Sequence, residues 1–159
     1  MDDEPDRDES RAPEVEDLVA LCRSLNRESV GYVLIGGFAV VLHGFVRTTK
    51  DIDLLVDASA ENVRALKRAL ADLQDNAIAE IEDGDVDRYT VVRVADEIVI
   101  DLMARACGVD YAEAQRLGIE SRELHGVTIP VASRALLIRT KDTVRASDAM
   151  DVAFLRSLG

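Results

Sequence analysis

The stretch Leu34–Val56 restricts the fold of this chain more than any other part of the sequence. It begins as a short apolar strand, turns at Gly36-Gly37, continues as a small helix and ends in a second strand that starts with Asp51 and Asp53. Because successive side chains of a strand point to opposite faces, the two aspartates share one face while the aliphatic residues around them face the core. The stretch therefore predicts a mixed α/β domain with two acids at the start of a buried strand.

A third acid is expected beside this pair. Asp101 lies in the middle of an otherwise apolar predicted strand, Glu97–Met103. A buried carboxylate without a partner is costly, and neighbouring carboxylates repel each other unless a cation lies between them. Asp51, Asp53 and Asp101 are therefore predicted to form one cluster that binds Mg²⁺, or Mn²⁺ in its place. Mg²⁺ takes carboxylate oxygens and usually keeps phosphate oxygens and water as its other ligands.

The Gly36-Gly37 turn fits a phosphate ligand of that kind. Glycine allows a sharp turn and a close approach of the ligand to the backbone. The helix expected over about residues 37–44 would direct its N-terminal amides toward a bound phosphate. A Gly-Gly pair alone is common in turns. Its position between an apolar strand and an Asp-x-Asp strand is what makes it informative.

These residues resemble a known family pattern. Gly36-Gly37-Phe38-Ala39, then His43-Gly44, Arg47-Thr48-Thr49 and Asp51-Ile52-Asp53-Leu54 resemble the nucleotidyltransferase superfold of DNA polymerase beta and the CCA-adding enzymes. The similarity is closest to small stand-alone prokaryotic members, including abortive-infection nucleotidyltransferases of toxin–antitoxin systems. It is strong over about residues 30–56 and looser over 97–103 and 133–155.

The resemblance implies a fold and an activity. The expected fold is a single α/β (α+β) domain with a mixed central sheet flanked by helices. The expected reaction is Mg²⁺-dependent transfer of NMP from an NTP to a hydroxyl of tRNA or of a protein, with a cognate toxin or antitoxin as a partner. Asp51, Asp53 and Asp101 would be the catalytic and metal-binding residues. The nucleotide would be bound by six further residues: Gly36, Gly37, Arg47, Lys50, Lys141 and Arg145.

The family's C-terminal pattern also has a match here. A lysine followed by Arg-x-x-Asp-x-x-Asp stands as Lys141, Arg145, Asp148 and Asp151. We place Lys141 and Arg145 in the penultimate helix. In the members that this chain resembles, these residues lie beside the nucleotide.

Every candidate residue also has a purely structural explanation. Asp51 and Asp53 could form the exposed face of an edge strand, and Asp101 could pair with an arginine. Lys141, Arg145 and Asp148 could form ordinary ion pairs on a helix surface, and Arg47 and Lys50 could only counter the charge of neighbouring acids. The rival function is a domain of the same fold that binds a nucleotide or partner protein without turnover, or that serves as an antitoxin.

The rest of the sequence predicts further elements. Apolar periodicity, turn residues and caps predict helices from Pro13 through Leu25, from Ser59 to Leu73, over Asp110–Leu117, from Ser133 through Val144, and from about Ser147. They predict strands at Tyr32–Ile35, Ala77–Ile81, Tyr89–Val94 and Glu97–Met103, with a hairpin turn at Ala95-Asp96. Two more, Ser121–Leu124 and Val127–Val131, are expected to pair across His125-Gly126.

Composition limits the partners. With 159 residues, a net charge of -12 and a pI near 4.5, the chain suits one soluble domain and does not suit broad binding to nucleic-acid backbone. Residues 1–12 are strongly acidic and are expected to form a disordered tail before the domain at 13–159. No apolar run is long enough to cross a membrane, so we expect a cytoplasmic protein with two reduced cysteines. The oligomeric state is not predicted.

Overall fold

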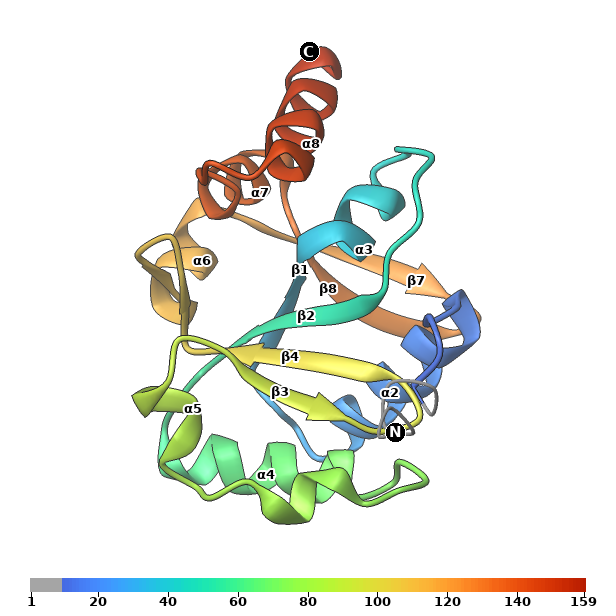
Figure 1. Ribbon diagram of the computed structural model, residues 1–159, viewed down its shortest axis with the longest axis vertical. Helices are drawn as coiled ribbons and strands as arrows, with labels where there is room; N and C mark the ends of the chain where they lie inside the picture. The colour runs from blue at the N-terminus through green and yellow to red at the C-terminus, as the bar shows by residue number, and fades with distance from the viewer. Residues whose placement is uncertain (1–9) are drawn as a thin grey trace, which may run out of the picture.

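The fold is a six-stranded mixed sheet with helices on both faces, as expected (Figure 1). The computed structural model describes residues 10–159. The strand order is β3-β4-β2-β1-β8-β7, in which β1 and β8, and β2 and β4, are parallel and the other neighbours antiparallel. The strands are β1 (Tyr32–Ile35), β2 (Asp51–Val56), β3 (Val92–Ala95), β4 (Val99–Met103), β7 (Ile119–Leu124) and β8 (Val127–Ala132). A second, two-stranded sheet joins β5 (Arg105–Ala106) to β6 (Val109–Asp110).

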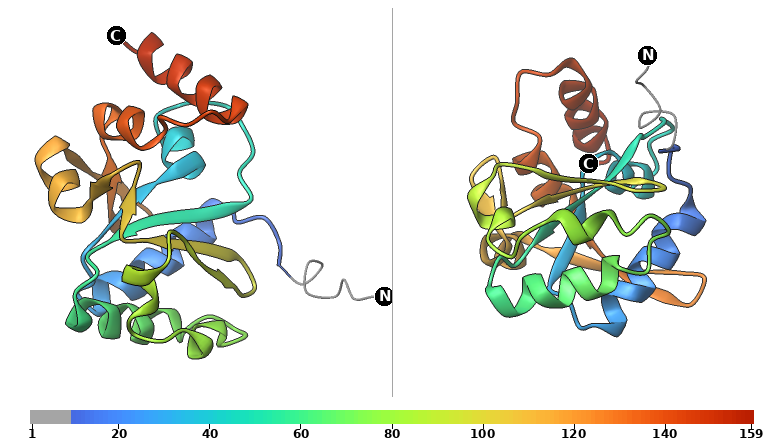
Figure 2. Two further views of the ribbon diagram at one scale, coloured as in Figure 1. Left: turned by 60° about the vertical axis from the view of Figure 1, so that its left-hand side comes forward. Right: turned by 60° about the horizontal axis from the view of Figure 1, so that its bottom comes forward.

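The helices form two layers around the large sheet (Figure 2). On one side, α2 (Val15–Arg27) and α4 (Ala60–Leu70) pack against each other. On the other side lie α3 (Gly36–Leu42), α7 (Arg134–Thr140) and α8 (Ala146–Ser157), with α6 (Tyr111–Leu117) beside α7. No described helix is both long and apolar enough to cross a bilayer.

Local sequence explains most of these elements. The apolar stripe of α2, which includes Leu18, Cys22 and Leu25, is buried against the sheet. The hydroxyls of Ser59 and Ser133 accept hydrogen bonds from backbone amides in the first turns of α4 and α7, as the predicted N-caps should. His125 and Gly126 both have positive φ and form the tight turn between β7 and β8.

Two predicted helix ends are wrong. Helix α4 ends at Leu70 instead of Leu73. Helix α7 ends at Thr140, so Lys141 is its C-cap and Arg145 is the N-cap of α8. Val144 is fully exposed between the two helices and is not part of an apolar stripe. Lys141 and Arg145 therefore lie at the two ends of the α7–α8 connection, and not in one penultimate helix.

The segment after α4 also differs from expectation. Ala77–Glu80 forms a short 3-10 helix (η1) instead of a strand, followed by a turn of helix, α5 (Asp85–Arg88). The buried carboxylate of Asp96 accepts hydrogen bonds from the backbone amides of Asp75 and Ala77, at 2.8 Å each. These bonds hold the start of η1 in a turn that a strand could not adopt.

The first described residues contact the β3–β4 hairpin. Arg11 forms a parallel bridge with Ile98, and the Ser10 hydroxyl donates to the backbone oxygen of Asp96 at 2.7 Å. Residues 10–12 of the expected tail are thus part of the folded domain. The rest of that segment, residues 1–9, lies outside the described residues.

Candidate active site

Strand register brings the three predicted acids together. Strands β2 and β4 are parallel neighbours, and Asp53 pairs with Asp101 across them. Asp51 lies two residues before Asp53, so all three carboxylates project from the same face of the sheet. One oxygen of each lies within 4.8 Å of the other two. Strand β2 is an interior strand between β1 and β4, which excludes the edge-strand interpretation of its two acids.

The cluster has more negative charge than its surroundings favour. Burial, together with the charges of Asp51 and Asp101, raises the pKa of Asp53 to about 7. Burial and the charge of Asp101 likewise raise the pKa of Asp51. A cation placed between the three groups would relieve both effects.

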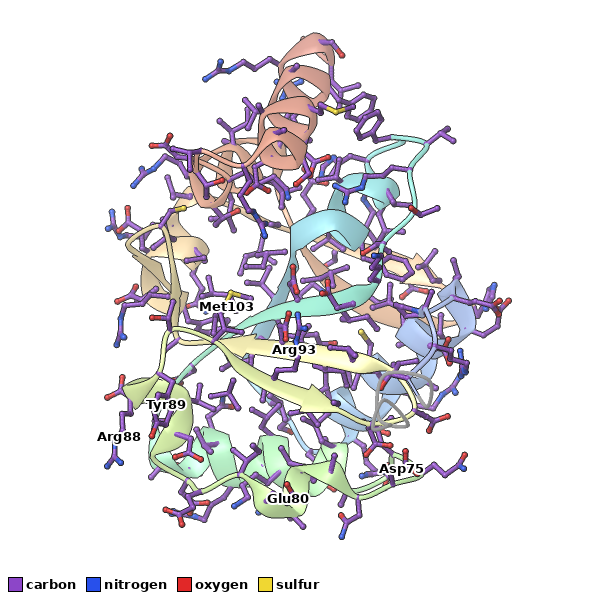
Figure 3. The ribbon with its side chains drawn as sticks, viewed as in Figure 1. Asp75, Glu80, Arg88, Tyr89, Arg93 and Met103 are labelled. Atoms are coloured by element: carbon purple, nitrogen blue, oxygen red, sulfur yellow. The ribbon has the colours of Figure 1, made fainter. Side chains whose placement is uncertain are left out.

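Arg93 partly supplies that cation. Its side chain projects from β3, where Arg93 pairs with Asp101 in the antiparallel ladder (Figure 3). The guanidinium donates through Nε and Nη2 to the two oxygens of Asp101, at 2.9 Å each, and through Nη2 to Asp51 at 3.3 Å. Asp101 therefore does pair with an arginine, as the structural alternative expected. The pair lies within the same acid cluster that could hold a metal.

Gly36 allows the backbone to pass directly beside the cluster. Its φ is +75°, and a Cβ atom there would lie 2.1 Å from Oδ2 of Asp53. A side chain would therefore clash with the carboxylate as well as strain the backbone. At Gly37 a Cβ atom would lie 3.2 Å from the guanidinium of Arg47 and from the hydroxyl of Thr49. Close packing therefore requires a glycine at position 36, whereas at position 37 the side chains of Arg47 and Thr49 would only have to shift slightly.

A cavity of about 410 Å³ opens over the turn and the acids. It is large enough for part of a nucleotide, since ligand sites usually measure about 300–1,000 Å³. Seven of the nine predicted site residues line it: Gly37, Arg47, Lys50, Asp51, Asp53, Lys141 and Arg145. Gly36 lies beneath it against Asp53, and Asp101 lies next to Asp53 on the neighbouring strand.

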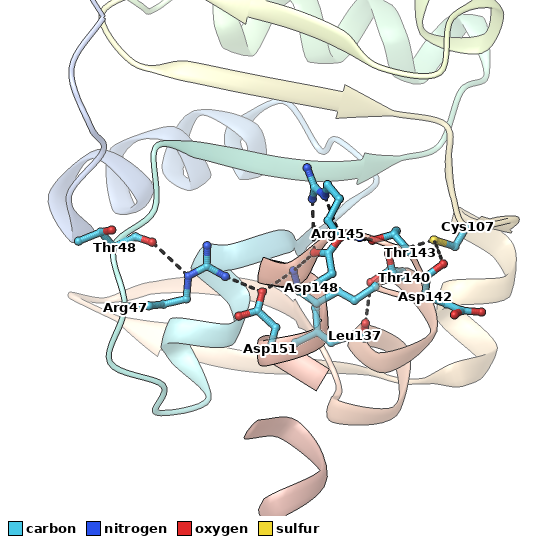
Figure 4. A network of polar contacts seen from close by, with 11 residues as sticks. Arg47, Thr48, Cys107, Leu137, Thr140, Asp142, Thr143, Arg145, Asp148 and Asp151 are labelled. Atoms are coloured by element: carbon cyan, nitrogen blue, oxygen red, sulfur yellow. Dashed lines mark hydrogen bonds and ion pairs between the residues drawn. The ribbon is translucent and has the colours of Figure 1, made fainter. Parts of the chain in front are cut away.

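Three of the four basic side chains that line this cavity pair with two buried aspartates (Figure 4). Lys141 Nζ lies 3.2 Å from Asp148 and 2.8 Å from Asp151. Arg145 bonds Asp148 through Nε at 3.0 Å, and Arg47 bonds Asp151 through Nη1 at 2.5 Å. Three cations thus share two carboxylates. Lys141, Asp148 and Asp151 are almost fully buried, so the pairs of Lys141 are not the surface ion pairs of the alternative interpretation. Arg145, whose side chain is 72% exposed, does form the i,i+3 pair with Asp148 that this interpretation expected.

The donor set of the acid cluster fits a hard divalent cation. Three carboxylates converge from two rigid strands, and oxygen ligands of this kind are those that Mg²⁺ and Mn²⁺ prefer. The residues that could hold the ion are the three predicted ones.

Two features of the site were missed in the sequence. Arg93 was not singled out, because an arginine in an alternating strand is ordinarily a solvated residue. The pairing of Arg47 with Asp151 joins residues 104 positions apart, a contact that local patterns do not reveal.

A mixed sheet carrying an Asp-x-Asp strand, a third acid on the adjacent parallel strand and a Gly-Gly turn packed against the acids defines the class of protein: a nucleotidyltransferase-fold enzyme. The family model described as "Nucleotidyltransferase of unknown function (DUF6036)" matches residues 14–102. The chain belongs to this family.

Solved structures support the same fold. The chain is similar to the lincosamide antibiotic adenylyltransferase LnuA in its lincomycin-bound form, with a TM-score of 0.61 and 19% identity over 94% of this chain and 100% of that one. It is also similar to TM1012 from Thermotoga maritima, a provisionally assigned nucleotidyltransferase, with a TM-score of 0.54 and 18% identity over 91% of both chains. A comparison with curated proteins finds no significant match.

Proposed function

We propose that the protein transfers NMP from an NTP to a hydroxyl group in a reaction that depends on Mg²⁺ or Mn²⁺. The acceptor oxygen forms a bond to the α-phosphorus as the bond from that phosphorus to the bridging oxygen of pyrophosphate breaks. Pyrophosphate leaves with the electron pair of that bond, and the acceptor proton passes to a base. Bound divalent cations would stabilise the charge on the attacking and leaving oxygens.

The proposal gives each residue of the site a role. Asp51, Asp53 and Asp101 hold the cations, and the Asp101 carboxylate receives the proton of the acceptor. Gly36 and Gly37 let the triphosphate lie close to the backbone. The four basic residues around the cavity, Arg47, Lys50, Lys141 and Arg145, offset the phosphate charge.

One observation carries the proposal. Three carboxylates from two adjacent strands lie within 4.8 Å of one another, directly beside position 36, which only a glycine can occupy. A purely structural acid cluster would not need a glycine packed against it, and raised pKa values such as those of Asp51 and Asp53 are common at functional sites. The basic cavity beside the cluster supplies the second half of a nucleotide site.

The acceptor belongs to the proposal as well. The resemblance to small prokaryotic members favours a hydroxyl of tRNA or of a protein, in a toxin–antitoxin or abortive-infection setting. LnuA, whose fold is similar, is an adenylyltransferase for a lincosamide antibiotic, so a small-molecule alcohol is a further acceptor class to include in the test.

The test is incubation of the purified protein with each α-³²P-labelled NTP, Mg²⁺ and cell extract, with detection of a labelled product and of pyrophosphate. The isosteric substitution Asp53→Asn should lower transfer by about a hundredfold or more, since it removes a group that holds transition-state charge. Substitution of the exposed Asp83 by Asn is the matched control and should leave transfer unchanged.

The competing function is nucleotide binding without turnover. It is favoured by the ion pairs that already occupy Lys141, Arg145 and Arg93 in the described residues. Binding of an NTP with Mg²⁺ but no labelled product with any extract fraction would favour that function over the enzyme.

A further inference from the structure

A second cavity, of about 700 Å³, adjoins the acid cluster. Lys50 and Asp51 line both this cavity and the predicted nucleotide cavity. The second cavity is also lined by residues of β3 and β4, which lie on the other side of β2 from β1 and the Gly-Gly turn. Three small apolar residues, Ala12, Ala95 and Val99, form part of its lining. Nucleotide binding in the first cavity assigns no role to this second cavity.

Basic side chains outnumber acidic ones in the lining of the second cavity. The protein carries a net charge of -12, yet three basic residues and one acid line this space: Arg11, Lys50, Arg93 and Asp51. Arg11 is held by a bidentate pair with Asp17 and lies 3.6 Å from Glu97, and Arg93 is paired with Asp101 and Asp51. Among residues 10–159, Lys50 has no ion-pair partner. Lys50, together with Arg93 once Arg93 leaves the acids, would give this cavity a positive charge, which favours an anionic ligand.

Arg93 is the residue that links this cavity to the metal site. Its side chain is 59% exposed, so it can move without disturbing the core. In the structure it donates to the oxygens of Asp101 and Asp51. Those oxygens are the ones that a divalent cation would need, and a carboxylate oxygen that coordinates a cation has less negative charge to offer a guanidinium. Metal binding and the present position of Arg93 therefore compete.

We propose that the second cavity receives the hydroxyl acceptor, that this acceptor carries a phosphate or carboxylate group, and that Arg93 binds this anionic group once a divalent cation has taken its place on the acids. This inference rests on the proposed function. The reaction requires the attacking hydroxyl to approach the α-phosphorus from the side away from the leaving pyrophosphate, and a cavity on the opposite side of β2 from the nucleotide cavity would allow this approach. Because Arg93 would leave the acids only when a cation binds to them, tight binding of the acceptor would depend on an occupied metal site.

The first test measures metal affinity without any reaction. Mn²⁺ binding is followed by the loss of its free EPR signal in the wild type, in Arg93→Gln and in Arg93→Lys. Because Arg93→Gln removes the competing cation, it should tighten Mn²⁺ binding about tenfold, and Arg93→Lys, which keeps the charge but not the bidentate geometry, should lie in between. Arg88→Gln is the matched control, since Arg88 points outward from α5 (Figure 3) and should not change Mn²⁺ affinity.

The second test measures anion binding with inorganic phosphate as the probe. Titration calorimetry compares wild type and Arg93→Gln with and without saturating Mg²⁺. With Mg²⁺, the substitution should weaken phosphate binding about tenfold. Without Mg²⁺, it should have little effect, because Arg93 is then held by the acids. The same titration with acetate distinguishes the sources: an Arg93-dependent response to phosphate alone indicates a phosphorylated acceptor, and to acetate alone a carboxylate.

The outcomes separate this inference from the proposed function. Unchanged Mn²⁺ affinity in a folded Arg93→Gln protein would show that Arg93 does not compete with the cation for Asp101. That result would overturn the proposal that a cation displaces Arg93 from the acids. Tighter Mn²⁺ binding with no Arg93-dependent response to either anion would overturn the anionic acceptor. If the wild type binds Mn²⁺ but Asp53→Asn binds it equally well, the proposed function itself fails.

Discussion

Gly36, in the first strand–helix turn, places its backbone directly against the carboxylate of Asp53 in the acid cluster. Its importance was predictable from the Gly-Gly-to-Asp-x-Asp pattern, since such a turn between an apolar strand and a short helix brings backbone close to the next strand. The identity of its neighbour was not predictable, because the contact with Asp53 Oδ2 depends on how β1 and β2 pair.

Replacement of this glycine should abolish the site while the chain still folds. Gly36→Ala places a Cβ atom onto Asp53 and imposes a positive φ on an L-residue. We expect a loss of about 1–3 kcal/mol in the free energy of unfolding and a loss of Mn²⁺ binding, measured by urea denaturation and EPR. Gly84→Ala is the matched control, because nothing lies within 4 Å of its Cβ position and its φ is negative. Equal Mn²⁺ binding by the two variants would contradict the account.

At the scale of elements, the strands that carry the acids were predictable and their partners were not. The alternation of Asp51, Asp53 and Asp101 with aliphatic residues predicted a shared face, which the register confirms. A two-residue turn at Ala95-Asp96 would have paired Arg93 with Ile98, so this expectation concealed the pair that Arg93 forms with Asp101. The observed loop is longer because Asp96 turns its carboxylate toward the backbone amides of η1 and Glu97. Such a buried polar cap is set by tertiary packing.

The α7–α8 connection was also predictable in part: its residues followed from the sequence, but its conformation did not. The residues Lys141, Arg145, Asp148 and Asp151 were predicted from their spacing, whereas their location on two helices with a non-helical connection was not. Val144 resembles the next residue of an apolar stripe, but the need to bring Lys141 and Arg145 to one carboxylate ends the helix before it.

The stability of this connection should depend on pH through Asp148. Burial alone would raise the pKa of Asp148, but hydrogen bonds from Arg145 and Thr143 and the charge of Lys141 outweigh it and lower the pKa to about 2. Because the folded-state pKa lies below the ordinary value of 3.8, Asp148 contributes stability above about pH 4 that is lost as pH falls toward 2.

Asp148→Asn should therefore destabilise the protein by about 2 kcal/mol at pH 7 and by much less near pH 2, in urea denaturation at several pH values. The exposed Asp142, in the same connection, gives a matched Asp→Asn control that should show no such pH dependence. A destabilisation by Asp148→Asn that is constant between pH 7 and pH 2 would show that the ion pairs do not hold the connection.

At the scale of the whole molecule, the sheet places two cavities on either side of one acid cluster. The proposed nucleotide cavity, with the Gly-Gly turn and the α7–α8 connection, lies on the β1 side of Asp51, and the second cavity, which Arg93 lines, lies on the β4 side. The fold class, the interior position of the acid strand and the basic cavity follow from the sequence pattern and its family resemblance. The second cavity did not, since it is built from residues of β3, β4 and the segment before α2, which meet only in the folded chain.

The central claim is that Asp51, Asp53 and Asp101 jointly bind a divalent cation in place of Arg93. The most direct measurement is the anomalous difference density of a crystal soaked in Mn²⁺. We expect a peak between the three carboxylates, with the Arg93 guanidinium moved away from Asp101. A crystal without such a peak at saturating Mn²⁺, in which Arg93 keeps both bonds to Asp101, would contradict the account.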